Sequence, residues 1–200
     1  MTHVSPGLLV VGGSYSLSVE WWSPDAAAPG CSLPPLPSYT GGGHTLDMVA
    51  GTLLSCYNLT CLNLNLTLGQ DNSIVGWQEA MELNKTRKDH SSMVTSDGLF
   101  LLGGWEAPSS TELLSITEEP EEEVDVEGWA LETGRKDHCS IQLDPTTIVL
   151  TGGFGTFDLT TLHLLTDTGL LDFTLPSLGM GRRKHACGAY SVDRDGTQVN

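Results

Sequence analysis

The stretch RKDHSSMVTSDGLFLLGG, residues 87–104, decides the fold because both of its ends recur along the chain. Its opening tetrad returns as RKDH at residues 135–138 and as RRKH at residues 182–185. Four histidines, three of which close these tetrads, recur at spacings of 46, 48 and 47 residues: His44, His90, His138 and His185. A fixed period of this length indicates an array of structural repeats, in which each unit buries its apolar side chains against the next.

Two further signals recur at the same period. An apolar run ends in paired glycines three times: Gly12 and Gly13, Gly103 and Gly104, Gly152 and Gly153. A tryptophan follows later in the same number of repeats: Trp22, Trp77 and Trp129. The arginines that open the tetrads are Arg87, Arg135 and Arg182. The repeats therefore span approximately residues 1–40, 41–86, 87–134, 135–181 and 182–200, of which the first and the last are partial.

Each repeat contains short apolar or alternating segments that are bounded by turn residues. In the repeat 135–181, turns are predicted at residues 144–145 and 167–169 and a glycine-rich bend follows residue 151. The predicted strands cover residues 139–143, 147–151, 159–165 and 170–175. The second repeat alternates leucine with polar residues over residues 62–68. Four antiparallel strands in about 45 residues, without a helix-length period, predict an all-β chain of propeller blades.

The recurring residues are typical of packing between neighbouring blades rather than of catalysis. Paired glycines permit positive φ and close approach of neighbouring blades, and a tryptophan on a later strand offers a large apolar plate. The arginines and histidines are expected at strand entries, where they can donate hydrogen bonds to loop carbonyls. Four histidines could also line one metal site, but equivalent positions in successive blades would spread around a ring. The pairs Asp89–His90 and Asp137–His138 are expected to point to opposite sheet faces, which excludes a catalytic triad.

The glycine pairs, the later tryptophans and the Arg-x-x-His entries resemble the kelch family of β-propellers, over nearly the whole chain. The second repeat departs from the family pattern, with Ser55-Cys56 in place of the glycine pair and Gly41 in place of the arginine. The tyrosine that the family usually carries between the glycines and the tryptophan is not evident. Because kelch propellers usually have six blades, the resemblance implies about four blades of a larger propeller. Closure of the two partial repeats into a four-bladed ring is the alternative.

The kelch resemblance implies a non-catalytic scaffold that binds unidentified partner proteins through inter-strand loops, with no cofactor and no bound metal. Two alternatives stay open. One is a propeller enzyme, either a galactose-oxidase-like copper enzyme or a sugar-acting enzyme. The other is the substrate-recognition part of a ubiquitin-ligase adaptor. The four tyrosines do not form a recurring set with the remaining histidines, and nucleotide-binding and hydrolase motifs are absent from the sequence. The sequence therefore predicts a protein that is not an enzyme.

Charge and hydropathy exclude two classes of partner. The 200 residues hold 25 acidic residues against 9 Lys and Arg, a net charge of −16, which repels nucleic-acid backbones. About half of this excess lies in the run from Glu118 to Glu127. That run is expected to be a solvated inserted loop, with docking of a basic partner or weak Ca²⁺ binding as the alternatives. No apolar stretch approaches the ~20 residues that span a bilayer, so membrane insertion is not expected.

Five cysteines and three N-glycosylation sequons bear on whether the protein is extracellular or cytoplasmic. Cys56 and Cys61 flank a four-residue segment that is expected to be a hairpin loop, which would place them at disulfide distance; reduced thiols are the alternative. The pairing of Cys31, Cys139 and Cys187 is left open, with at least one cysteine unpaired or bound outside the chain. The sequons begin at Asn58, Asn65 and Asn84. Together these features favour an extracellular location over the cytoplasmic alternative.

Overall fold

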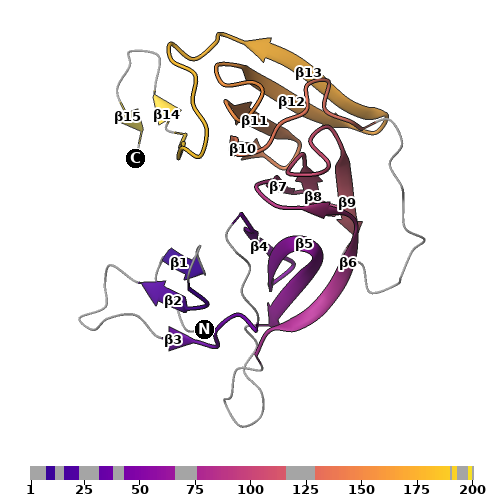
Figure 1. Ribbon diagram of the computed structural model, residues 1–200, viewed down its shortest axis with the longest axis vertical. Coiled ribbons are helices and arrows are strands. Elements are labelled where there is room, and N and C mark those ends of the chain that lie inside the picture. Colours follow the sequence, from indigo (N-terminus) through magenta and orange to yellow (C-terminus); the bar gives the residue numbers. More distant parts are fainter. Residues whose placement is uncertain are drawn as a thin grey trace. The chain divides into compact units, whose positions relative to one another are not determined.

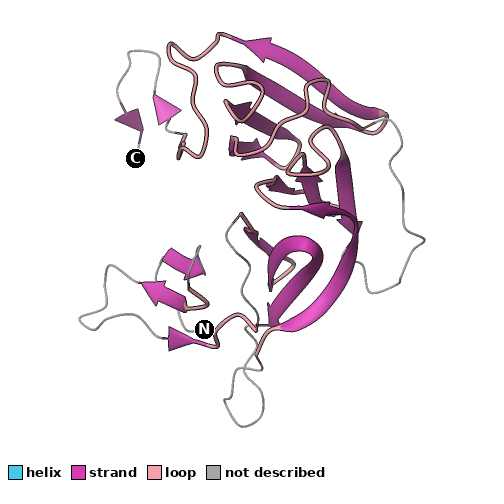
Figure 2. Ribbon diagram, in the orientation of Figure 1, coloured by secondary structure: helices cyan, strands magenta, loops and turns pink. Residues whose placement is uncertain are grey.

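The structure is a computed structural model, and its described part comprises residues 8–11, 16–22, 32–37, 43–65, 76–115, 129–189, 191–192 and 198–199. All helical or strand structure in these residues is β-strand (Figure 2), which confirms the predicted all-β class. The described residues accordingly contain no helix with the length and apolar character needed to cross a bilayer.

The chain divides into two compact units, Met1–Lys88 and Asp89–Asn200. The first unit holds two antiparallel three-stranded sheets (Figure 1). Their strands are β1 (Leu8–Val11), β2 (Val19–Trp22) and β3 (Ser32–Leu33), followed by β4 (Thr45–Val49), β5 (Thr52–Asn65) and β6 (Gln78–Arg87). Each sheet pairs its strands in chain order, and each lies within one predicted repeat except that β6 ends one residue beyond it.

The second unit holds three antiparallel sheets, which also pair their strands in chain order. The first contains β7 (Ser91–Val94), β8 (Gly98–Leu102) and β9 (Thr111–Ser115). The second contains β10 (Cys139–Asp144), β11 (Thr147–Thr151), β12 (Thr160–Thr166) and β13 (Gly169–Leu175). A short pair, β14 (Ser191–Val192) and β15 (Gln198–Val199), follows. The four strands of the middle sheet match the predicted segments to within one residue at every boundary.

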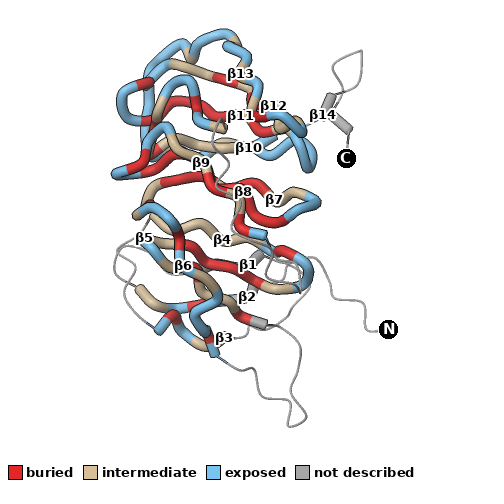
Figure 3. Tube along the Cα trace, turned by 90° about the vertical axis from the view of Figure 1, so that its right-hand side faces the viewer, coloured by how far each residue is buried: buried red, intermediate tan, exposed pale blue. Residues whose placement is uncertain are grey.

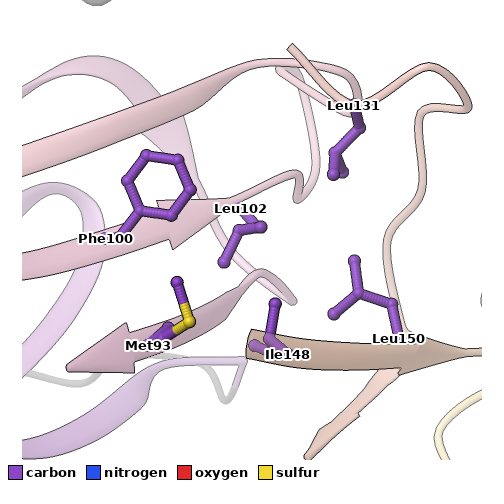
Figure 4. Close-up of a cluster of buried hydrophobic side chains, with 6 residues drawn as sticks. All are labelled: Met93, Phe100, Leu102, Leu131, Ile148 and Leu150. Atoms are coloured by element: carbon purple, nitrogen blue, oxygen red, sulfur yellow. The ribbon is translucent and has the colours of Figure 1, made fainter. Parts of the chain in front are cut away.

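Each unit has an apolar core where successive sheets meet. In the second unit, Figure 4 shows side chains from β7, β8, β11 and the loop at residue 131 directed toward one another: Met93, Phe100, Leu102, Leu131, Ile148 and Leu150. Strand β8 is buried along its whole length (Figure 3). In the first unit the core joins the two three-stranded sheets through Val19, Leu36, Leu53, Leu64 and Trp77. Burial of each such large side chain stabilises a fold by about 1.5–3 kcal/mol, so these contacts hold consecutive sheets together.

The glycine pairs allow the close approach between repeats that the sequence predicts. Gly103 and Gly152 have φ of 65° and 63°, and both Gly104 and Gly153 have φ of 104°. A Cβ on Gly103 would lie 2.6 Å from the carbonyl oxygen of Arg135, and a Cβ on Gly152 would lie 2.4 Å from that of Arg182. The first pair, Gly12 and Gly13, lies outside the described residues.

Main-chain hydrogen bonds link the tetrads of consecutive repeats. The third residue of each tetrad has a left-handed backbone, with φ of 54° at Asp89, 56° at Asp137 and 51° at Lys184. The Asp137 N–H donates to the Asp89 carbonyl (3.1 Å), and the Lys184 N–H donates to the Asp137 carbonyl (2.9 Å). The second glycine of each pair adds a further link, because the Gly104 and Gly153 N–H groups donate to the carbonyls of Arg135 and Arg182. The same backbone geometry therefore repeats along the unit.

Several local predictions are corrected by the structure. Only the repeat 135–181 shows four strands, and the described residues of the three preceding repeats show three each. Trp77 precedes β6 and Trp129 lies in a loop, so neither lies on a strand as predicted; Trp22 does end β2. The Asp–His pairs lie in bends before β7 and β10, so the expected alternation across a sheet does not apply to them.

The predicted hairpin loop between Cys56 and Cys61 is instead part of one continuous strand. Strand β5 pairs with β4 through its first half and with β6 through its second half, which Figure 1 shows as a strongly curved ribbon. Asn58, between the two cysteines, has φ of 54°, and the two cysteine Cα atoms lie 4.1 Å apart. Of the predicted alternation over residues 62–68, Leu64 is buried, and residues 66–68 lie outside the described part.

Candidate functional site

The second unit carries an exposed aromatic and cationic cluster on the loops that follow its glycine pairs. We call it the loop surface and define it as Trp105, Lys136, Phe154, Phe157 and Arg183. Trp105 directly follows Gly104, and Phe154 directly follows Gly153, so these two aromatics occupy equivalent repeat positions. The three aromatic residues are 42%, 47% and 44% exposed, respectively, in chain order. Large aromatic side chains left exposed side by side are typical of interaction sites.

Cations lie against the aromatic rings of the loop surface. The Lys136 ammonium lies 2.7 Å from the centre of the Trp105 ring and 4.8 Å from that of Phe154. The guanidinium of Arg183 lies 5.5 Å from the centre of the same Phe154 ring. Phe154 also contacts Phe157 edge-to-face, with ring centres 5.8 Å apart. Each cation–π contact contributes about 0.5–1 kcal/mol at an exposed position, so the five side chains order one another.

The backbone fixes the loops that present these side chains. The Phe154 N–H donates to the Lys136 carbonyl at 2.8 Å, and the Arg182 N–H donates to the Phe157 carbonyl at 2.6 Å. Gly181 packs beneath Phe157, where a Cβ would lie 2.7 Å from the Phe157 Cβ. The loop surface is therefore held rigidly by the sheet ends from which it projects.

A buried polar network lies in the same unit, and recurrence in the sequence does not reveal it. The Thr161 hydroxyl and the His163 Nε2 atom lie 2.6 Å apart, and the His163 Nδ1 atom lies 2.6 Å from an Asp172 carboxylate oxygen. The other oxygen of Asp172 accepts the Glu132 N–H at 2.9 Å. Burial alone would raise the pKa of Asp172, but the hydrogen bonds from His163 and Glu132 hold it below its usual value.

The Thr161–His163–Asp172 series has the order of a nucleophile, a base and an acid, but its position does not suit catalysis. Thr161 is 6% exposed and His163 is 1% exposed. A nucleophile must reach the substrate, and this hydroxyl is covered within the sheet. The network instead fastens β12 to β13 and to the loop at Glu132.

The recurring arginines differ in their surroundings. Arg87, at the end of β6, and Arg135 are fully buried, whereas Arg182 is exposed. Arg135 donates to the Leu150 carbonyl at 3.4 Å, and among the described residues its Nε and Nη2 atoms have no hydrogen-bond partner. Burial lowers the pKa of Arg135 to about 10, and the opposing charge of Asp172 limits the decrease. Arg135 thus bonds a strand carbonyl of its own repeat, and not the inter-repeat loop carbonyl that the sequence suggested.

Three of the recurring histidines, His44, His90 and His138, directly precede β4, β7 and β10, whereas His185 lies six residues before β14. Two of the four, His138 and His185, have shifted pKa values. His90 is buried, and His138 and His185 are half-buried. The Nε2 atom of His138 lies 2.8 Å from the Ser91 hydroxyl of the preceding repeat. Burial lowers the pKa of His138 to about 3, with further contributions from Arg135 and from the neighbouring histidines, His90 among them. Burial and then Arg182 lower the pKa of His185.

This arrangement predicts acid sensitivity. Since His138 has a pKa of about 3 in the folded chain and of about 6.5 when unfolded, the unfolded state binds the extra proton between these values. Stability from this residue is therefore complete above pH 6.5 and is lost as the pH falls toward 3. We expect the free energy of unfolding to fall by about 2 kcal/mol between pH 7 and pH 5, measured by urea denaturation.

The matched variant for this prediction is His138→Gln, which keeps a polar side chain but cannot titrate. We expect a much weaker dependence on pH for this variant, with a residual slope from His185. Equal slopes in the variant and the parent chain would contradict the assignment to His138.

Two disulfides are present in the described residues. The predicted bridge Cys56–Cys61 is confirmed, and Cys139 is bonded to Cys187, a pairing that the sequence left open. Cys31 lies outside the described residues. Two bridges favour an oxidising, extracellular setting. Of the sequon residues, Asn58 and Asn84 are exposed on β5 and β6, and the side chain of Asn65 lies outside the described part.

The described residues contain no cluster of three or more His, Cys, Asp or Glu side chains arranged to hold a metal ion. The remaining predicted structural residues support the cores. Trp77 donates from its indole nitrogen to the Pro34 carbonyl at 3.0 Å, and Trp129 lies edge-to-face with Phe100 at 5.6 Å. The acidic run from Glu118 to Glu127 lies outside the described residues.

Comparison with known proteins yields likenesses to solved structures. No model of a protein family matches the chain, and no curated protein matches its sequence. Among solved structures, the chain is similar to one titled "Structure of YjhT", with a TM-score of 0.64 and 11% sequence identity. The alignment covers 90% of this chain and 65% of that one. At this identity the likeness concerns the fold alone.

Proposed function

We propose that the chain is a segment of a kelch-type β-propeller and acts as a non-catalytic scaffold that binds a partner protein through its inter-strand loops. Successive antiparallel sheets with the same glycine-pair geometry and the same main-chain links support the propeller. The likeness in fold to YjhT over 90% of the chain is consistent with it. The function itself is argued from the site, because a fold does not determine what a protein binds.

The loop surface is the observation that carries this proposal. Trp, Phe and Arg side chains are enriched in protein interfaces, where buried aromatic side chains contribute large apolar areas. Here Trp105, Phe154 and Phe157 are all more than 40% exposed, while the loops beneath them are fixed by hydrogen bonds. Rigid loops lose little freedom on binding, which suits a surface that recognises a partner.

The proposal predicts that a partner depends on Phe154. The immobilised full chain should retain a protein from extracellular fluid or cell extract that the Phe154→Ser variant does not retain. Once purified, that protein should bind the Phe154→Ser variant at least tenfold more weakly, measured by calorimetry. The expected factor follows from the cost of about 1.4 kcal/mol or more when an interface aromatic is truncated.

The matched control is Phe173→Ser, which removes an equally exposed phenylalanine (48%) from β13 of the same unit. It should bind the partner with unchanged affinity. A partner lost equally from both variants, or retained by both, would refute the proposal that the loop surface is the binding site.

We further propose an extracellular location, with glycans on Asn58 and Asn84. Both side chains are exposed, and both disulfides would persist in that compartment.

A further inference from the structure

We infer that the loop surface binds an acidic, carboxylate-rich peptide segment of the partner protein. This inference rests on the proposed function and adds the chemistry of the partner to it. It follows from the charges of the loops and from the way in which the aromatic faces are occupied.

Cations are concentrated on these loops in a chain that is otherwise acidic. The chain contains 9 Lys and Arg residues in total, against a net charge of −16. Four of them lie in the loop segments around the surface and are exposed or half-buried: Lys136, Arg182, Arg183 and Lys184. The exposed acids of the same loops are Glu106, Glu132 and Asp158, and Asp137 is buried 3.5 Å from the Lys184 ammonium. The four cations therefore outnumber the three exposed acids of these loops.

The aromatic faces already hold cations of this chain. Trp105 and Phe154 present the electron-rich faces that attract an ammonium or a guanidinium. Lys136 lies over both rings, and Arg183 lies over Phe154. A lysine or arginine of a partner would have to displace them and would meet their charges. The N–H groups of Lys136 and Arg183 are instead hydrogen-bond donors for carboxylates.

The net charge of the chain does not prevent this contact. At physiological ionic strength the Debye length is about 8 Å, so distant acidic residues are screened. The groups that a docked peptide meets directly then determine the electrostatic energy. Arg183 is suited to this contact because a guanidinium can donate two parallel hydrogen bonds to one carboxylate.

The inference can be tested with three fluorescein-labelled decapeptides and the full chain. Each peptide carries the same central Leu-Phe pair, flanked by Glu and Asp, by Gln and Asn, or by Lys and Arg. In fluorescence anisotropy at 0.15 M salt, we expect the acidic peptide to bind at least tenfold more tightly than the neutral one. The basic peptide should not bind detectably.

Two charge reversals provide a matched pair of variants. Arg183→Glu should weaken binding of the acidic peptide at least tenfold. Lys85→Glu alters the net charge equally but changes an exposed lysine on β6 of the other unit, and it should weaken binding less than twofold. Both side chains are exposed, so both variants should fold, which circular dichroism can verify.

The outcomes separate this inference from the proposed function. Equal binding of acidic and neutral peptides, or equal weakening by the two reversals, overturns the acidic partner. If a captured partner depends on Phe154 but not on Arg183, the scaffold function stands and this inference fails. If neither a partner nor any peptide depends on Phe154, both fail.

Discussion

Replacing Gly152 with alanine is expected to lower the free energy of unfolding of the second unit by about 4 kcal/mol. The left-handed backbone at φ 63° costs a residue with a Cβ about 1–2 kcal/mol. The new methyl group would also lie 2.4 Å from the Arg182 carbonyl oxygen, and relieving such overpacking costs about 1–3 kcal/mol. That carbonyl accepts the Gly153 N–H, so its displacement weakens a link between repeats. Urea denaturation followed by circular dichroism measures the loss.

Two other glycines serve as controls for this prediction. Gly155 has φ of 89° but no atom within 4 Å of its ideal Cβ, so Gly155→Ala should cost only the backbone term of about 1–2 kcal/mol. Gly179 has neither a positive φ nor a neighbour within 4 Å, so Gly179→Ala should change stability by less than about 0.5 kcal/mol. A Gly152→Ala loss no larger than that of Gly155→Ala would show that close approach between repeats is unimportant.

Removal of the Cys139–Cys187 bridge should have an effect of similar size. The bridge joins residues 48 apart in sequence, and closing a loop of that length in the unfolded chain is worth about 4 kcal/mol in the chain-entropy account. The double variant Cys139→Ser/Cys187→Ser leaves no free thiol from this pair. We expect it to lose about 4 kcal/mol in urea denaturation. Hydrogen exchange should increase first near residues 182–189, which the bridge attaches to β10.

The second disulfide provides the comparison. Cys56 and Cys61 are separated by only 5 residues, so the same account gives about 2 kcal/mol for Cys56→Ser/Cys61→Ser. If the short bridge proves more important than the long one, loop length does not govern the contribution of these disulfides. The strong curvature of β5 would then better explain why the Cys56–Cys61 bridge contributes more to stability.

The sequence predicts the features that depend on one repeat at a time. The strands of residues 135–181 follow from alternation and turn residues, and the positive φ of Gly103 and Gly152 follows from their recurrence. The bridge between Cys56 and Cys61 follows from short-range spacing, although the strand that contains it is not a simple hairpin. The Cys139–Cys187 pairing depends on how one repeat packs on the next, which spacing alone does not determine.

The two missed sites left partial signals. The turn predicted at residues 167–169 is a hairpin whose register places His163 directly opposite Asp172. Extending the pairing from that turn would place His163 beside Asp172, but His163 does not recur, so the repeat pattern does not single it out. Likewise, Trp105 and Phe154 each follow a glycine pair directly. Their exposure could not be inferred, because nothing in the sequence distinguishes an aromatic side chain that is buried in a core from one that is exposed to solvent.

The ladder formed by Asp89, Asp137 and Lys184 has a consequence for how such a chain can change over time. Its rungs are amide-to-carbonyl bonds, so substitution of side chains does not remove them, provided that the new residue tolerates the left-handed conformation. Asp and Asn adopt it readily, and Lys184 shows that a longer side chain can adopt it as well. The amino-acid sequences of the repeats can therefore diverge while the backbone geometry is kept.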